Sequence, residues 1–287
     1  FRPWRAIARP SALAKALAAV LLAMLAACSH RSVVPIEGTL QVPANTKLVA
    51  IEVQNGSVRL KRGNPGQFAF RGDLRRSAES AEQLARLEAI PTAFTAEVDP
   101  ARPDRLVVRS PRVAEADLGP AFLAVEAELT VPPGVEGTLN IAGSGHIEAD
   151  GLEANLNLDT RRGDLRLMRC TGSAVLRTSQ GMTIVYDHRG DLDIKVTLGD
   201  MQVFVREPGK ALRLVTGQGN VQCLVPPDTG FRLDARAQTG KAANGFGIPV
   251  EQTAYSAAMV GERGDGRTQI VLRTEQGHLS LSHKTFD

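Results

Sequence analysis

The chain has 287 residues, of which 43% are hydrophobic and only 4% aromatic, and its formal net charge is +3 at pH 7. This composition excludes an intrinsically disordered chain and allows a large core made mainly of aliphatic side chains. Residues 1–27 contain four basic and no acidic residues, so the rest of the chain is close to neutral. A near-neutral body lacks the positive field that nucleic-acid binding requires, and we expect no nucleic-acid partner.

The first 27 residues have the pattern of a secretory signal peptide. Basic residues come first, an apolar run extends from Ala16 to Leu25, and small residues precede Cys28. This run is too short to cross a bilayer, which needs about 20 apolar residues. We therefore predict an exported protein whose signal peptide comprises residues 1–27.

The tetrapeptide Leu25-Ala26-Ala27-Cys28 resembles a bacterial lipobox. The resemblance implies cleavage before Cys28, diacylation of its thiol, and a body tethered to a membrane through lipid. Ser29 stands where an Asp would resemble an inner-membrane retention signal, so the outer membrane is the expected address, on either its periplasmic or its surface side. An ordinary signal peptide with an incidental cysteine is the alternative. Residues 28–35 are predicted to be a lipidated linker.

The next part of the chain combines short alternating stretches with turn signals. Ser77 to Ala89 is the most convincing helix, because Ser80 and Gln83 have the spacing of a capping box. The basic cluster of Arg71, Arg75 and Arg76 is expected to be solvated surface. Strands are predicted over residues 36–60, 92–98, 105–109 and 121–131.

A nine-residue period begins at Gly145. Its seven start points are Gly145, Ala154, Gly163, Gly172, Gly181, Gly190 and Gly199. The second and fourth residues after each start are apolar in thirteen of fourteen cases, whereas the first and third are mostly polar. Alternation with period two indicates strands with one buried face, and the glycines suit the tight turns between them.

These repeats predict an all-β fold, a β-solenoid or β-roll of short strands with nine-residue half-coils and one short helix near the N-terminal side. One nonamer cannot bury its apolar face alone, so the units must stack. Two nonamers per coil form one rung, with rungs about 4.8 Å apart. We expect one repeat domain over residues 36–287, with a regular array over about 131–225 and a long loop or cap over 240–268. Copies of the repeat at Gly56 and Gly277 predict that the fold begins and ends with the same element.

The same pattern resembles the "putative adhesin" family of bacterial β-strand-repeat proteins, domain of unknown function 4097. The resemblance covers about residues 38–281 and is carried by the Gly-Asp-Leu and Gly-Asn-Val repeats, together with Asn55-Gly-Ser-Val-Arg-Leu60, Val131-Pro-Pro-Gly134 and Arg273-Thr-Glu-Gln-Gly277. It implies a β-solenoid or β-roll that is often exported. It supplies no catalytic residues, and a fold alone does not define a function.

Residues able to perform chemistry are scattered. The Gly-Asp turns lack the flanking glycines of calcium-binding rolls, so their Asp side chains are expected to make turn contacts, and His146 and His278 are expected on the surface. Cys223 falls on a core position and Cys170 in a turn, which argues against a disulfide. The sequence shows neither a nucleophile elbow nor a convergent carboxylate pair. We therefore predict a protein that is not an enzyme and that uses no cofactor or metal.

One group of apolar residues departs from the alternation. Met182, Ile184 and Tyr186 fall on the nominally polar face, and Met168 and Phe204 lie two nonamers before and two nonamers after Tyr186. A rung of two nonamers would stack Met168, Tyr186 and Phe204, which makes the group a candidate interaction patch. The alternative is that another segment, such as the 77–89 helix, covers it.

Three hypotheses follow. The first is a lipid-anchored envelope protein with a non-catalytic, adhesin-like role, which binds an envelope protein or polysaccharide. The second is a structural scaffold or spacer with no specific ligand. The third and least favoured is a polysaccharide-acting β-helix enzyme, because the repeats contain no cluster of convergent charged groups.

Overall fold

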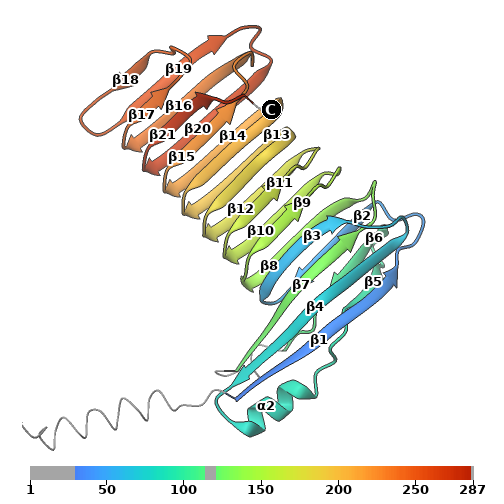
Figure 1. The fold of residues 1–287 in the computed structure, drawn as a ribbon. Coiled ribbons are helices and arrows are strands. Elements are labelled where there is room, and N and C mark those ends of the chain that lie inside the picture. The colour runs from blue at the N-terminus through green and yellow to red at the C-terminus, as the bar shows by residue number, and fades with distance from the viewer. Residues whose placement is uncertain (1–29, 114–120, 286–287) are drawn as a thin grey trace, which may run out of the picture.

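The computed structural model describes residues 30–113 and 121–285. Most of these residues lie in strands, and the part of the chain described contains one helix, α2, near the N-terminal side. Its strands join into one continuous 21-stranded sheet. Figure 1 shows that this sheet is folded into long stacks of strands, with α2 at one end and the C-terminal strands at the other. The predicted all-β fold with one short helix is confirmed.

The strands form two stacks, each hydrogen-bonded from neighbour to neighbour, and β13 and β14 pass from the second stack to the first. In spatial order, the first stack contains β6 (Arg102–Arg109), β2 (Leu48–Val53), β8 (Glu136–Ser144), β10 (Leu156–Arg162), β12 (Ala174–Gln180), the later parts of β13 (Thr183–Leu198) and β14 (Met201–Gln218), β20 (Thr268–Gln276) and β16 (Phe231–Thr239). The second contains β7 (Phe122–Val131), β3 (Gly56–Arg62), β9 (Ile147–Asp150), β11 (Leu165–Met168), the early parts of β13 and β14, β15 (Val221–Val225), β21 (Leu279–His283) and β17 (Ala242–Asn244).

Parallel pairing brings equivalent positions of successive repeats side by side. Ile147 pairs with Leu165, and Leu165 pairs with Thr183, so the partners are two nonamers apart. Beyond β13 the step lengthens by two residues, as between Met201 and Val221. The regular region therefore has the register that two nonamers per rung predict.

The strand order at both ends departs from the chain order. The rung of β2 and β3 lies inside that of β6 and β7, and the rung of β20 and β21 lies inside that of β16 and β17. The copies of the repeat at Gly56 and Gly277 are thus internal rungs, and the prediction that they are the first and last elements is wrong. Because these strands lie inside the stacks, both edges of each one are hydrogen-bonded to a neighbouring strand.

Antiparallel strands follow at both ends. β4 (Gln67–Ala78) pairs with β7 and then with β1 (His30–Gln41), while β5 (Thr95–Asp99) pairs with β6. At the other end, β19 (Ala257–Arg263) joins β16 and then β18 (Val250–Gln252). Of the two alternatives predicted for residues 240–268, the long loop is wrong, since three short strands lie there, and two of them, β19 and β18, extend the sheet beyond β16 as a cap would.

The N-terminal boundary also needs correction. Residues 30–35, predicted as part of a linker, form the first half of β1 and pair with residues 73–78 of β4. Alternating burial along β1, with Ile36 buried, explains why this segment joins the sheet. The predicted signal peptide and the predicted lipidation site, Cys28, lie outside the described residues. Helix α2 (Ala81–Glu88) is shorter than expected, but the capping box of Ser80 and Gln83 is present.

Aliphatic side chains from the two stacks fill the interior. Leu158, Leu165 and Leu176 have no exposed surface, and Leu192 is 2% exposed. Buried threonines also line the turn that leads from the first stack to the second. The Thr178 hydroxyl donates to the Gly163 carbonyl at 3.2 Å, and the Thr216 hydroxyl donates to the Gly199 carbonyl at 3.1 Å. Where a threonine occupies this position, the rung is tied to the preceding turn by a hydrogen bond as well as by packing, whereas Val196 on β13 contributes packing alone.

Candidate interaction surface

An apolar column runs across the outward face of the second stack. Met168, Tyr186, Phe204 and Leu224 are direct register partners on β11, β13, β14 and β15. The rings of Tyr186 and Phe204 have centroids 5.7 Å apart and are tilted by 54°. The structure thus brings together three of the five residues proposed from sequence. We call the four residues the apolar column.

The apolar column is only partly covered. Tyr186 retains 37% exposure, and the other three members are half-buried. The Lys284 ammonium lies 4.7 Å from the Tyr186 centroid and 4.6 Å from that of Phe204, a cation–π arrangement over both rings. A cation at this position adds a positive charge to the border of the apolar column.

The other two predicted patch residues lie beside the apolar column. Ile184 is two residues from Tyr186 on the same strand, so it shares the outward face, and its register partners are Arg166 and Gln202. Met182 lies in the preceding turn, where its backbone N–H donates to Asp164 at 2.9 Å. Both side chains are half-buried. All five predicted residues therefore belong to one area of the surface.

Helix α2 lies elsewhere. It packs against β4 and β1, at the end of the molecule remote from β14 and β15 (Figure 1). Among the described residues, Lys284 is the one with a ring contact to the apolar column from outside the stacked strands. The alternative that this helix covers the patch is wrong.

Leu224 is the member that a strict nine-residue spacing misses. It pairs with Phe204 but lies two residues later than two nonamers would place it, because the rung step has lengthened there. All four members are nevertheless the fifth residue after a turn glycine, namely Gly163, Gly181, Gly199 and Gly219. Counting from the glycine, rather than along a fixed period, would have found it.

The residue after several of the turn glycines has a structural role. The Asp200 carboxylate accepts the Asn220 backbone N–H at 2.7 Å, and the Asn220 side chain accepts that of His278 at 2.9 Å. The His146 Nδ1 likewise accepts the Asp164 backbone N–H at 3.0 Å. The predicted turn contacts of the Gly-Asp pairs are therefore rung-to-rung hydrogen bonds, and Asn and His perform the same task.

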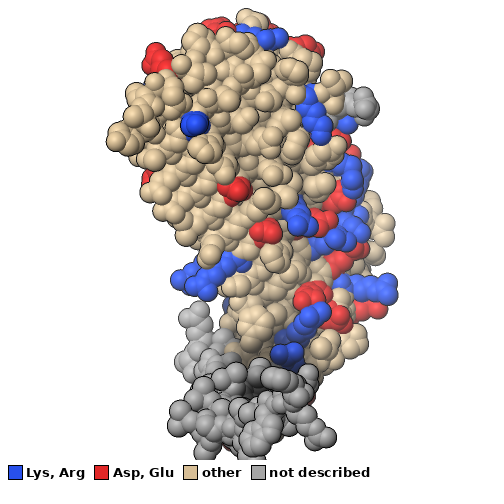
Figure 2. All heavy atoms as spheres, turned by 60° about the vertical axis from the view of Figure 1, so that its left-hand side comes forward, with Lys and Arg blue, Asp and Glu red and all other residues tan. Residues whose placement is uncertain are grey.

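Charges on the N-terminal half of the second stack compensate one another. Arg59 pairs with Glu148 at 3.1 Å, and Lys61 pairs with Glu128 at 2.6 Å. A shallow groove of about 580 Å³ lies among these residues. Figure 2 shows positive and negative side chains interspersed along one border of the molecule, next to a broad face with few charges. Exposed pairs of this kind contribute little to stability, and each leaves little net charge for a ligand.

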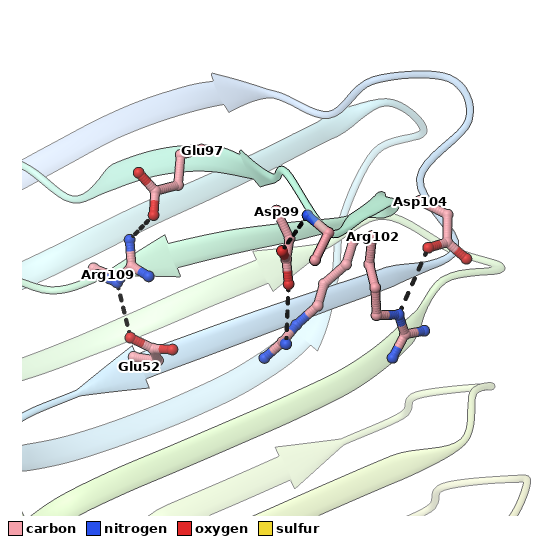
Figure 3. Close-up of polar contacts among 8 residues, drawn as sticks. Glu52, Glu97, Asp99, Arg102, Asp104 and Arg109 are labelled. Atoms are coloured by element: carbon pink, nitrogen blue, oxygen red, sulfur yellow. Dashed lines mark hydrogen bonds and ion pairs between the residues drawn. The ribbon is translucent and has the colours of Figure 1, made fainter.

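Ion pairs also hold the edge strand β5. Arg109 on β6 donates to Glu97 on β5 and, at 2.8 Å, to Glu52 on β2 (Figure 3). Hydrogen bonds from Arg109 to Glu97 and Glu52 raise the pKa of this guanidinium further. The Asp99 carboxylate forms an ion pair with the Arg105 guanidinium at 3.3 Å in the same region. Since each member of this group is already paired, the group fastens the edge strand and is not an open site.

One member of the predicted basic surface is buried. Arg76 is only 4% exposed and donates to the Ile90 carbonyl at 3.3 Å. Arg76 follows exposed Arg75 on β4, so its side chain points from the opposite face of the strand, which is buried. The expectation that all three arginines are solvated is wrong for Arg76.

Three titratable side chains, those of Cys170, Cys223 and His188, are buried in the interior. Burial raises the pKa of the Cys170 thiol to about 11 and that of the Cys223 thiol to about 12, so both stay protonated near neutral pH. Both are free thiols, and Cys170, which lies in a turn as expected, is only 1% exposed. His188 is 1% exposed, neither ring nitrogen has a hydrogen-bond partner among the described residues, and burial lowers its pKa.

Within the described part of the chain, no three His, Cys, Asp or Glu side chains come together as metal ligands would. No helix in residues 30–113 or 121–285 has the length and hydropathy of a membrane span.

The geometry defines a repetitive β-protein with stacked parallel rungs and an exposed apolar column. The chain belongs to the Toastrack DUF4097 family, whose pattern matches residues 122–282. No curated protein matches the sequence.

Two solved structures are similar at the level of overall architecture. One is a "putative cell adhesion protein" from Clostridium sporogenes, with 10% identity, a TM-score of 0.37, and coverage of 88% of this chain and 100% of the other. The other is a "putative adhesin" from Bacteroides fragilis, with 11% identity, a TM-score of 0.35, and coverage of 88% and 97%. Similarity this distant carries no information about what this chain binds.

Proposed function

We propose that this β-solenoid is a lipid-anchored protein of the cell envelope, without catalytic activity, which binds an envelope protein through the apolar column and its neighbours Met182 and Ile184. The observation that carries the proposal is the register of the column. Four large apolar side chains on four consecutive strands point away from the core, although each could be polar without affecting the interior. Exposed apolar groups that are contiguous, rather than scattered, are typical of interaction sites.

The scaffold beneath the column suits a binding role. Parallel pairing on both sides fixes each strand, and the side chains on the inner face are fully buried. Little backbone ordering is then needed when a partner docks, which lowers the entropic cost of association. The aromatic pair Tyr186 and Phe204 provides the kind of rigid anchor that dominates interface energetics.

A double variant of the column and a matched control variant distinguish this proposal from a pure scaffold role. Tyr186→Thr combined with Phe204→Thr removes both rings while retaining residues suited to strands. Val260→Thr is the control, since Val260 is an apolar strand residue with 59% exposure on β19, far from the column. Full-length protein carrying each change would be used to capture partners from envelopes, and binding of the identified partner would then be measured with purified components.

The double variant is expected to weaken that partner's binding at least tenfold with only a small drop in melting temperature, which comes from the lost contacts between the two rings and with Lys284, whereas the control should bind normally. Equal binding by all three proteins would contradict the proposal and favour a scaffold. A large drop in melting temperature would show that the rings belong to the core.

A further inference from the structure

The outward face of the first stack carries a column of like charges. Arg177, Lys195, Val215, Arg273 and Arg236 are successive register partners on β12, β13, β14, β20 and β16. Four of five consecutive strands therefore present a basic residue at one position. We call these four residues the basic column.

The outward charges on the second stack and on the neighbouring strand β4 have a different arrangement. There, Arg71, Glu128, Arg59, Glu148 and Arg166 alternate in sign along one column. Like charges directly opposite each other on neighbouring strands destabilise a sheet. The basic column differs, because four of its five strands carry the same sign and the acidic residue in this row, Asp159 on β10, lies beyond Arg177 at its end.

The first two members of the basic column form no ion pair, although Asp159 on β10 is the other register partner of Arg177. Arg177 and Lys195 are exposed neighbours, and neither forms an ion pair with any residue in the described segments. The other two share one carboxylate. Arg236 pairs with Asp234 at 3.0 Å, and Arg273 donates to the same carboxylate and, at 2.6 Å, to the Asp234 carbonyl. One carboxylate shared between two guanidinium groups leaves an excess positive charge.

A groove lies along three members of this column, and the fourth, Arg177, lies just outside its lining as the register partner of Lys195. It has a volume of about 550 Å³ and is lined by Lys195, Arg236 and Arg273, with Thr197 and Gln238 as uncharged hydrogen-bonding groups and Glu275 as the single carboxylate. That volume lies within the range of ligand pockets, about 300–1,000 Å³. Because strands are spaced about 4.8 Å apart, its basic groups repeat along a straight line.

We propose that this groove binds a linear anionic polysaccharide whose carboxylate or phosphate groups pair with Arg177, Lys195, Arg236 and Arg273. Repeated positive groups match repeated negative ones on an extended chain, while Thr197 and Gln238 suit sugar hydroxyls. The lining of the groove, all within the described residues, contains no aromatic side chain on which a nucleic-acid base could stack. The site is separate from the apolar column and does not depend on its having a partner.

Binding of full-length detergent-purified protein to polygalacturonate would test the proposal, with neutral dextran, single-stranded DNA and polyglutamate as comparison polymers. Arg177→Gln combined with Lys195→Gln removes two unpaired charges and should not lower the melting temperature, because it relieves repulsion between like charges. Lys47→Gln combined with Arg166→Gln is the control, since these exposed residues carry the same total charge outside the groove.

We expect polygalacturonate binding that weakens with salt, falls at least tenfold in the Arg177→Gln/Lys195→Gln variant, and changes less than twofold in the control. Dextran should not bind. Absence of polygalacturonate binding, an equal loss in the control variant, or binding of DNA or polyglutamate as tight as that of polygalacturonate would each overturn the proposal. A lower melting temperature in the groove variant would overturn the claim that its charges repel each other.

Discussion

The stability of this fold should decrease as the pH falls through 6.5 because His188 is buried. Its ring has no hydrogen-bond partner among the described residues, and burial lowers its pKa below the ordinary value of about 6.5. In the unfolded chain the same ring is in water and takes up a proton near pH 6.5. Below that pH the unfolded state therefore binds more protons than the folded state, and the free energy of unfolding falls.

The magnitude follows from linkage. One proton taken up only by the unfolded state changes the free energy of unfolding by up to about 1.4 kcal/mol per pH unit. This loss begins near pH 6.5, ends at the lowered pKa of the folded state, and is absent at pH 8. His188→Leu removes the titrating group, so the difference between wild type and variant isolates its contribution from that of the other histidines.

Urea denaturation at half-unit steps from pH 5 to pH 8 would measure the free energy of unfolding of the wild type and of His188→Leu. We expect the stability of His188→Leu relative to wild type to rise steadily as the pH falls below 6.5. Parallel pH profiles for the two proteins would refute the reasoning, because they would mean that His188 titrates equally in the folded and unfolded states. The circular dichroism signal at pH 8 serves as the control for an intact fold.

Three further predictions concern the rungs and the tether. Gly181→Ala should lower the free energy of unfolding, measured by urea denaturation, by at least about 2 kcal/mol, because φ is +150° and the new methyl would lie 2.1 Å from the Gly163 carbonyl oxygen. Gly66→Ala is the control and should lower it by about 1 kcal/mol, because Gly66 also has a positive φ but has open space around it. Equal losses of stability would contradict the close approach at Gly181. Thr178→Val should lower the free energy of unfolding, measured in the same way, by about 1 kcal/mol, because one hydrogen bond is lost. An unchanged stability would argue against that bond. Cys28→Ser should abolish labelling by a fatty-acid analogue and release the protein from the membrane fraction, and membrane retention without label would contradict the lipid tether.

The repeat and its register could be predicted from sequence because both depend on local alternation. Apolar residues every second position, with a turn glycine at every nonamer start but one, fix which side of each strand is buried. Leu165 and Leu192 lie in the core, as this pattern requires. The stacking of Met168, Tyr186 and Phe204 follows from the same period.

The order of the end rungs could not be predicted in this way. The strand β20 has the same alternation as its neighbours, and alternation does not specify which rung pairs with which. Strand pairing of this kind depends on contacts between residues far apart in sequence, such as Val49 with Leu106. The lengthening of the rung step is also invisible locally, because the irregular pairing after Tyr186 and after Gly190 moves residues without disturbing the pattern.

The candidate sites differ in how visible they are in the sequence. The apolar column interrupts a polar pattern, so its members can be recognised one by one. The basic column cannot be recognised in this way, because a basic residue on an outward position is ordinary. It becomes unusual only when the structure places Arg177 beside Lys195 and Arg273 beside Arg236.

The most direct test of the central claim is site-specific photo-cross-linking in living cells, with the cross-linker placed at Tyr186 on the apolar column or at Val260 on β19. We predict a discrete cross-linked envelope protein from the Tyr186 position and none from the Val260 position. Identical cross-linking patterns from the two positions, or none from either, would contradict the assignment of the column as the binding surface.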